Sequence, residues 1–167
     1  MSIAFLIVRI ILGLGLAAHG AQKLFGWFGG SGPAGTGGFF EQLGYRPGIL
    51  FAVAAGLGEF GGGLLTFLGL GGALGPALII LVMLTAIGSV HLGKGFFTAD
   101  GGPEMPLLYI AGALAVAFGG NGGLSLDAAL GIGFLTATNQ IWYAIAAAVV
   151  VALLNLMARR PGKTAAA

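Results

Sequence analysis

The feature that most constrains this chain is a single carboxylate inside a long uncharged stretch. Glu59 is the only charged residue between Gly48 and Val90, and it stands within the apolar segment Leu50–Leu70. A helix of about 20 apolar residues crosses a bilayer, so this segment is long enough to span a membrane. A carboxylate at its centre costs roughly 2.5–3.5 kcal/mol on insertion scales, so it faces a partner or a wet cavity rather than lipid. Two interpretations are open: a structural ion pair between helices, or a site for a proton, an ion or a cofactor.

The composition of the whole chain is that of an integral membrane protein. Of its 167 residues, 57% are hydrophobic and only 7% are charged, whereas soluble domains carry about 25% charged residues. Apolar runs cover residues 3–22, 49–70, 72–92, 105–119 and 141–158. The sequence therefore predicts an all-α membrane protein, with a four-helix transmembrane bundle followed by an added C-terminal transmembrane helix.

Residue usage excludes several classes of site. The chain has no cysteine, which excludes disulfides, iron–sulfur clusters, thiolate metal sites and covalent c-type haem attachment. The 34 glycines favour a tight bundle, because small residues let membrane helices approach closely. We read the small excess of basic residues as a signal of membrane topology, and we expect no nucleic-acid partner.

The basic residues also predict an orientation. With five spans, the loops at 23–48 and 93–104 lie on the same side as the C-terminus. That side carries six of the seven basic residues, namely Lys23, Arg46, Lys94, Arg159, Arg160 and Lys163. The positive-inside rule places this side in the cytoplasm and the N-terminus outside.

Glu59 has a candidate partner in the first helix. Arg9 lies 14 residues before Lys23, and Glu59 lies 11 residues after Gly48; at 1.5 Å per residue these depths are about 21 and 16 Å. An arginine side chain spans that difference, and a lone buried charge is expensive on either helix. We therefore expect Arg9 and Glu59 to form a buried ion pair.

Two histidines have matched positions. His19 lies four residues before Lys23, and His91 lies three before Lys94, so each sits about one helical turn inside the same membrane face. A neutral imidazole can ligate haem or a metal, or hydrogen-bond a quinone carbonyl; an interfacial histidine satisfied by water or backbone is the other interpretation. We expect both rings to face one cavity together with Glu59.

The predicted ligand-binding residues are His19, Lys23, His91 and Glu104, and no metal ligand is assigned. Quinone is the cofactor we consider first, and haem ranks below it because the sequence carries no further haem signal. Glu104 also has a sufficient structural explanation, because it stands at the start of the predicted fourth helix, where the helix dipole favours a negative charge.

Several segments, taken in order, resemble one family. They are Arg9, HGAQKLFGWFG (His19–Gly29), GGFFEQLGY, GLGEFGGGLLTFLGL (Gly56–Leu70), His91 with GFF, and PEMPLLYIAG. Together they resemble the DoxX family of small bacterial membrane proteins, over about residues 3–127. We accordingly expect a DoxX-like bundle in residues 1–127, and a linker with an extra helix in 128–167. The hairpin GLGGALG lacks a basic residue that family members often carry there.

The resemblance also implies a location and a role. It implies the bacterial cytoplasmic (inner) membrane, with several spans. The family name comes from the small subunit of a thiosulfate:quinone oxidoreductase; some members are linked with oxidative-stress or thiol-redox complexes, and many have no assigned activity. We therefore expect a redox-linked component that binds quinone or lipid near the cytoplasmic face, and whether it is an enzyme subunit stays open.

Two alternatives remain beside that expectation. The first is a non-catalytic structural or assembly subunit of a larger membrane complex, favoured by the bare Ala/Val-rich C-terminal helix. The second is a small transporter, which ranks last because no inverted repeat is visible. The expected partners are membrane lipid and other membrane or redox proteins.

Overall fold

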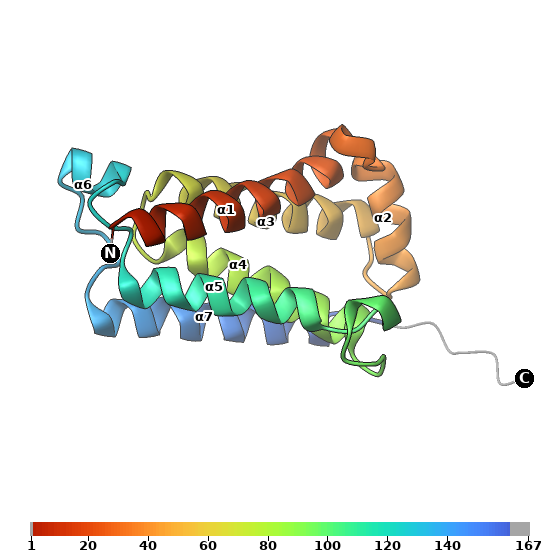
Figure 1. The fold of residues 1–167 in the computed structure, drawn as a ribbon. Helices are drawn as coiled ribbons and strands as arrows, with labels where there is room; N and C mark the ends of the chain where they lie inside the picture. Colours follow the sequence, from red (N-terminus) through yellow and green to blue (C-terminus); the bar gives the residue numbers. More distant parts are fainter. Residues whose placement is uncertain (1, 161–167) are drawn as a thin grey trace, which may run out of the picture.

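The computed structural model describes residues 2–160, and all regular structure within that range is helical. Five helices run side by side along one axis (Figure 1). They are α1 (Ser2–Phe25), α3 (Gly48–Leu68), α4 (Leu74–Ala86), α5 (Glu104–Gly119) and α7 (Thr138–Met157). α4 continues directly into a π-helix, η2 (Ile87–His91).

These helices confirm the predicted fold class. Four apolar helices reach the length of a membrane span: Ile3–Phe25, Gly48–Leu68, Leu74–His91 and Thr138–Met157. α5 is shorter, at 16 residues, or about 24 Å. It runs beside the others in Figure 1 and packs mainly against α4 and α1.

The short helices lie at the two ends of the bundle (Figure 1). At one end are η1 (Trp27–Gly29), α2 (Gly32–Gln42) and η3 (Thr98–Asp100), and at the other is α6 (Leu126–Leu130). The sequence predicts a short helix at FFEQLGY; α2 starts earlier, at Gly32, because Pro33 occupies its first turn, where the missing N–H is tolerated. α2 packs against α3 and α1 and therefore covers one end of the pair.

α1 and α3 form the closest helix pair, and glycines make the approach possible. A Cβ added at Gly13 would lie 2.6 Å from the Phe67 backbone nitrogen, and one at Gly63 would lie 2.6 Å from the Ala17 nitrogen. A Cβ at Gly20 would collide with the Phe60 nitrogen. The two backbones therefore touch, and this contact fixes the relative depth of the charges that each helix carries.

The main core lies around α4. Leu16 of α1, Ile79 of α4 and Val116 of α5 are almost fully buried, and Ala148 of α7 packs in the same cluster. α7 contacts α4 along its length and also reaches α5. The C-terminal helix thus shares the core of the helices that precede it.

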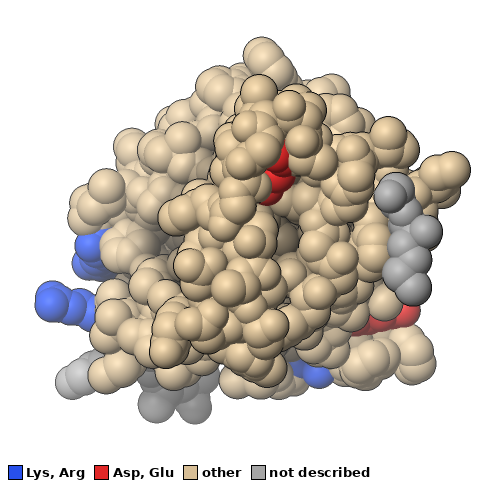
Figure 2. Space-filling view, turned by 90° about the vertical axis from the view of Figure 1, so that its left-hand side faces the viewer, with Lys and Arg blue, Asp and Glu red and all other residues tan. Residues whose placement is uncertain are grey.

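The end of α7 is tied to the loop between α2 and α3. The Arg160 backbone N–H donates to the Gly44 carbonyl at 2.8 Å, and Arg159 Nε donates to the Leu43 carbonyl at 3.0 Å. The ends of α1, η2 and α7 therefore lie at one end of the bundle, as a five-span chain requires (Figure 1). Lys163, counted in the charge argument, lies outside the described residues. Figure 2 views the opposite end, where blue and red areas are few and small.

Candidate functional site: a cavity beside a lysine–glutamate pair

Glu59 is paired with Lys23. Lys23 Nζ donates to Glu59 Oε2 at 2.6 Å, and the two side chains are 24% and 9% exposed. Within residues 2–160, Lys23–Glu59 is the only ion pair between a lysine or arginine and a carboxylate. The pair joins α1 to α3 and leaves no net charge at that point of the bundle.

The predicted pairing of Arg9 with Glu59 is wrong. Arg9 is buried, with 2% exposure, and its guanidinium donates to backbone carbonyls instead. Nη2 reaches the Phe67 oxygen at 3.2 Å and the Leu124 oxygen at 2.9 Å, and Nη1 bonds the Asn121 oxygen. Arg9 therefore holds the last turn of α3 against the loop that follows α5.

The helix register explains the error. The depth estimate assumed that Lys23 and Gly48 lie at the same level. Instead, Gly56 packs against the end of α1, where an added Cβ would lie 3.3 Å from Lys23 Cβ. The start of α3, at Gly48, therefore lies eight residues, or about 12 Å, beyond the level of Lys23. This shift places Glu59 beside Lys23 and moves Arg9 to the level of Phe67.

A cavity of about 830 Å³ opens next to the Lys23–Glu59 pair. His19, Lys23, Glu59 and His91 all line it, so the structure brings together four of the six residues singled out from the sequence. Most of the remaining wall is apolar or aromatic. It includes Phe39, Phe40, Tyr45, Phe51, Leu78, Val82, Met83, Ala86 and Val90.

The hydrogen bonds of the two histidines define their free nitrogens. His91 Nδ1 lies 2.7 Å from the Gly101 carbonyl, which can only accept, so this nitrogen carries the proton. His19 Nδ1 lies 3.2 Å from Gln22 Oε1, and Gln22 Nε2 donates to the Phe28 carbonyl, which fixes the direction of the amide. In each neutral ring Nε2 is then left as an acceptor for a further group.

Glu104 is not brought into the cavity. Its Oε2 accepts the Thr98 backbone N–H at 2.8 Å, and only its neighbours Met105 and Pro106 line the wall. The geometry fits the structural interpretation of Glu104, at the start of α5.

Five polar residues of the wall were missed by the sequence analysis: Tyr45, Thr85, Ser89, Tyr109 and Asn155. Tyr45 is buried, and its hydroxyl lies 2.7 Å from Ser89 Oγ. Asn155 could have been found, because it is the only carboxamide in the apolar run 141–158. Tyr45, Ser89 and Tyr109 carry no local signal and become neighbours only through folding.

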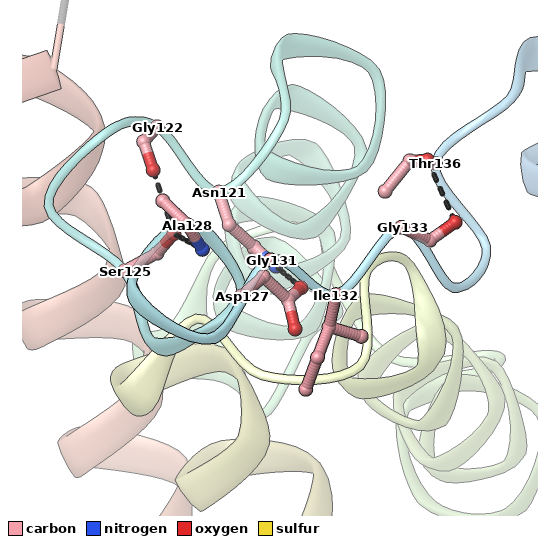
Figure 3. A pocket seen from close by; sticks show the side chains of 9 residues that line it. All are labelled: Asn121, Gly122, Ser125, Asp127, Ala128, Gly131, Ile132, Gly133 and Thr136. Atoms are coloured by element: carbon pink, nitrogen blue, oxygen red, sulfur yellow. Dashed lines mark hydrogen bonds between the residues drawn. The ribbon is translucent and has the colours of Figure 1, made fainter.

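A second, smaller hollow of about 330 Å³ lies at the opposite end of the bundle, around Asp127 (Figure 3). The buried Asp127 carboxylate accepts the Gly71 N–H at 2.9 Å, the Gly72 N–H at 2.8 Å and Asn121 Nδ2 at 2.8 Å. These bonds fasten α6 to the α3–α4 turn. Because three protein donors already engage this carboxylate, we assign it a structural role.

Metal binding has no support in the described part of the chain. Among residues 2–160, no group of three or more His, Asp or Glu side chains is arranged to hold an ion. The large cavity is the candidate site because of its size and because His19, Lys23, Glu59 and His91 line it.

The fold and the cavity define a multi-pass helical membrane protein with a ligand-sized space between its helices. A model of the DoxX family matches residues 4–92, just over half of the chain, and the chain belongs to that family. No match was found among curated proteins or among solved structures. The matched segment contains His19, Lys23, Glu59 and His91, whereas α5 and α7 lie beyond it.

Proposed function

We propose that this DoxX protein binds a quinone, or a similarly flat lipid-soluble ring, in the cavity beside Lys23 and Glu59. It would act as a redox-linked component of the bacterial cytoplasmic membrane. The observation that carries the proposal is the convergence of both histidines and the ion pair on one largely apolar cavity.

The size and lining of the cavity suit such a ligand. Its volume of about 830 Å³ falls within the roughly 300–1,000 Å³ of small-molecule sites, which combine apolar walls with a few placed polar groups. Phe39, Phe40 and Phe51 offer faces and edges for a planar ring. An isoprenoid or alkyl tail would be compatible with the apolar side chains of α3 and α4.

The polar groups have distinct parts in this proposal. His19 and His91 offer Nε2 as acceptors for a ligand hydroxyl or a water molecule, and Lys23 keeps N–H groups beyond the one that Glu59 uses. Glu59 holds Lys23 in place and balances its charge. A bound quinone supplies the capacity to accept two electrons and two protons, and the protein supplies orientation and a water-poor surround. Haem remains the lesser candidate for this cavity.

The proposal is tested by measuring what the purified protein retains from its membrane. Quinone extracted per mole of protein, together with the visible spectrum, is compared for wild type, His19→Ala and His91→Ala. Leu108→Ala is the control, because Leu108 is 60% exposed on α5 and does not line the cavity. We expect retained quinone to fall in both histidine variants and to stay at the wild-type level in the control.

Full quinone content in both histidine variants would contradict the site. A wild-type protein that holds no quinone and co-purifies with other membrane proteins would favour the alternative function, a structural or assembly subunit. Affinity capture from native membranes, with redox proteins as the expected companions, addresses the partner question directly.

A further inference from the structure

We infer that Asn155 on α7 is a ligand-binding residue of the same cavity and that it selects a neutral ligand oxygen. The inference rests on the proposed function and extends it to a helix outside the segment that the family model matches. Asn155 and Val151 are the residues that α7 contributes to the cavity wall.

The inward direction of Asn155 is fixed by its neighbours on the helix. Ala148 and Ala152, on the same side of α7, are buried against the bundle. Arg159 follows one turn after Asn155, and its guanidinium donates to the Leu43 and Gly88 carbonyls, both at 3.0 Å. The same guanidinium lies 5.9 Å from the centre of the Tyr45 ring. These contacts fix how the last turns of α7 are rotated about the helix axis.

The Asn155 carboxamide has no hydrogen-bond partner among the described residues, unlike the other short polar side chains of the wall. Ser89 Oγ is bonded to Tyr45, and Thr85 Oγ1 donates to the Leu81 carbonyl at 2.9 Å. A carboxamide offers two donors and an acceptor oxygen, and leaving these unpaired among apolar groups is costly. Asn155 is partly buried and lines the cavity, so a molecule bound there is the partner that we infer for this amide.

The charges around the cavity indicate the class of ligand. Lys23 is the only lysine or arginine lining the cavity among the described residues, and Glu59 already neutralises it. An anionic headgroup would have to compete with that carboxylate. The carboxamide, by contrast, donates to a carbonyl and accepts from a hydroxyl, so it suits a neutral oxygen on a ring.

The inference is tested by ligand binding to the full-length protein in detergent. A short-chain alkyl benzoquinone is titrated into each variant while tryptophan fluorescence is followed. Asn155→Leu removes the amide and keeps the branched shape of the side chain, and Asn155→Gln keeps an amide. Leu154→Ala is the control, because Leu154 is 58% exposed on the same helix.

We expect Asn155→Leu to weaken binding about three- to tenfold, the range of one hydrogen bond between neutral groups. Leu154→Ala should bind like wild type, and Asn155→Gln should bind more tightly than Asn155→Leu. The melting temperature of Asn155→Leu should match or exceed that of wild type, because the amide has no partner in the protein to lose.

The possible failures are distinguishable. Equal binding by wild type and Asn155→Leu overturns the role of Asn155 and leaves the proposed quinone site standing. A wild-type protein that does not bind the benzoquinone overturns both. Loss of folding in both Asn155→Leu and Asn155→Ala would show that the amide is structural, which also overturns the inference.

Discussion

Lys23 Nζ and Glu59 Oε2 lie 2.6 Å apart and join the end of α1 to the middle of α3. The contact lies at the edge of the large cavity, with the lysine more exposed than the glutamate. The same two side chains thus hold the closest helix pair together and set the charge of the candidate site.

Breaking this pair from one side should destabilise the bundle. Lys23→Met leaves the Glu59 carboxylate without its partner. We expect the free energy of unfolding to fall by roughly 2–4 kcal/mol. This loss is at or below the usual range for buried pairs, because Lys23 is partly exposed. Adding Glu59→Gln should recover part of this loss. Unfolding titrations in mixed detergent micelles measure both; a double variant less stable than Lys23→Met would contradict the pairing.

Arg9 should behave as an independent structural element. Arg9→Met removes the donors to three carbonyls, and we expect a loss of about 2–4 kcal/mol in the free energy of unfolding, since hydrogen bonds from charged groups contribute about 1.5–3 kcal/mol each and are only partly additive. Arg9→Lys should recover little, because an ammonium group cannot reach three carbonyls in a fork.

The coupling free energy between Arg9 and Glu59 distinguishes the two possible ion pairs, Arg9–Glu59 and Lys23–Glu59. In a double-mutant cycle, Arg9→Met and Glu59→Gln should add to within about 0.5 kcal/mol, as expected for distant sites. The matching cycle with Lys23→Met should show a coupling above about 1 kcal/mol. A large Arg9–Glu59 coupling would restore the pairing predicted from the sequence.

Glycine substitutions should show how tightly α1 packs on α3. We expect Gly20→Ala to lower the free energy of unfolding by about 1–3 kcal/mol, because the new methyl group collides with the backbone at Phe60. Gly61→Ala is the matched control, since a Cβ there meets nothing within 4 Å. It should be neutral or stabilising by up to about 1 kcal/mol. Thermal melting in detergent compares them, and equal effects would argue against the close contact.

The topology can be checked with reporters that are active only outside the cytoplasm. Lys23, Arg46, Lys94 and Arg159 belong to segments at one end of the bundle, and the positive-inside rule predicts that this end is cytoplasmic. A reporter fused after Ala167 should give no signal, whereas one inserted after Gly133 should be active. The reverse pattern would mean that the cavity opens toward the outer face.

Sequence reasoning predicted the helices and several of the residues that line the candidate cavity. Apolar runs mark the spans directly, and counting residues from a rim places His19 and His91 at similar depth. The partner of Glu59 was missed because a count along each helix does not reveal how far one helix is shifted against the next. That shift depends on where Gly20 meets the backbone of α3 and where Gly56 meets the side chains of Lys23 and Leu24.

The remaining cavity residues could not be found by the same route. Tyr109 carries no local signal, and although Asn155 is the only carboxamide in its apolar run, nothing in the sequence places it beside His19. Asp127 looks like an ordinary turn residue until Gly71 and Gly72 are folded against it. These side chains gain their roles only from tertiary contacts.

Because η2 is a π-helical turn, the direction of the His91 side chain depends on the number of residues in that turn as well as on their identity. The Leu92 N–H bonds the Ile87 carbonyl at 2.8 Å, five residues back, so this turn holds one residue more than an α-helical turn. Deleting any one residue between Ile87 and Val90 would restore α-helical spacing and rotate the imidazole by about 100° around the helix axis. Two chains could therefore share this histidine, and nearly all their other residues, while only the chain with the extra residue presents its imidazole to the cavity.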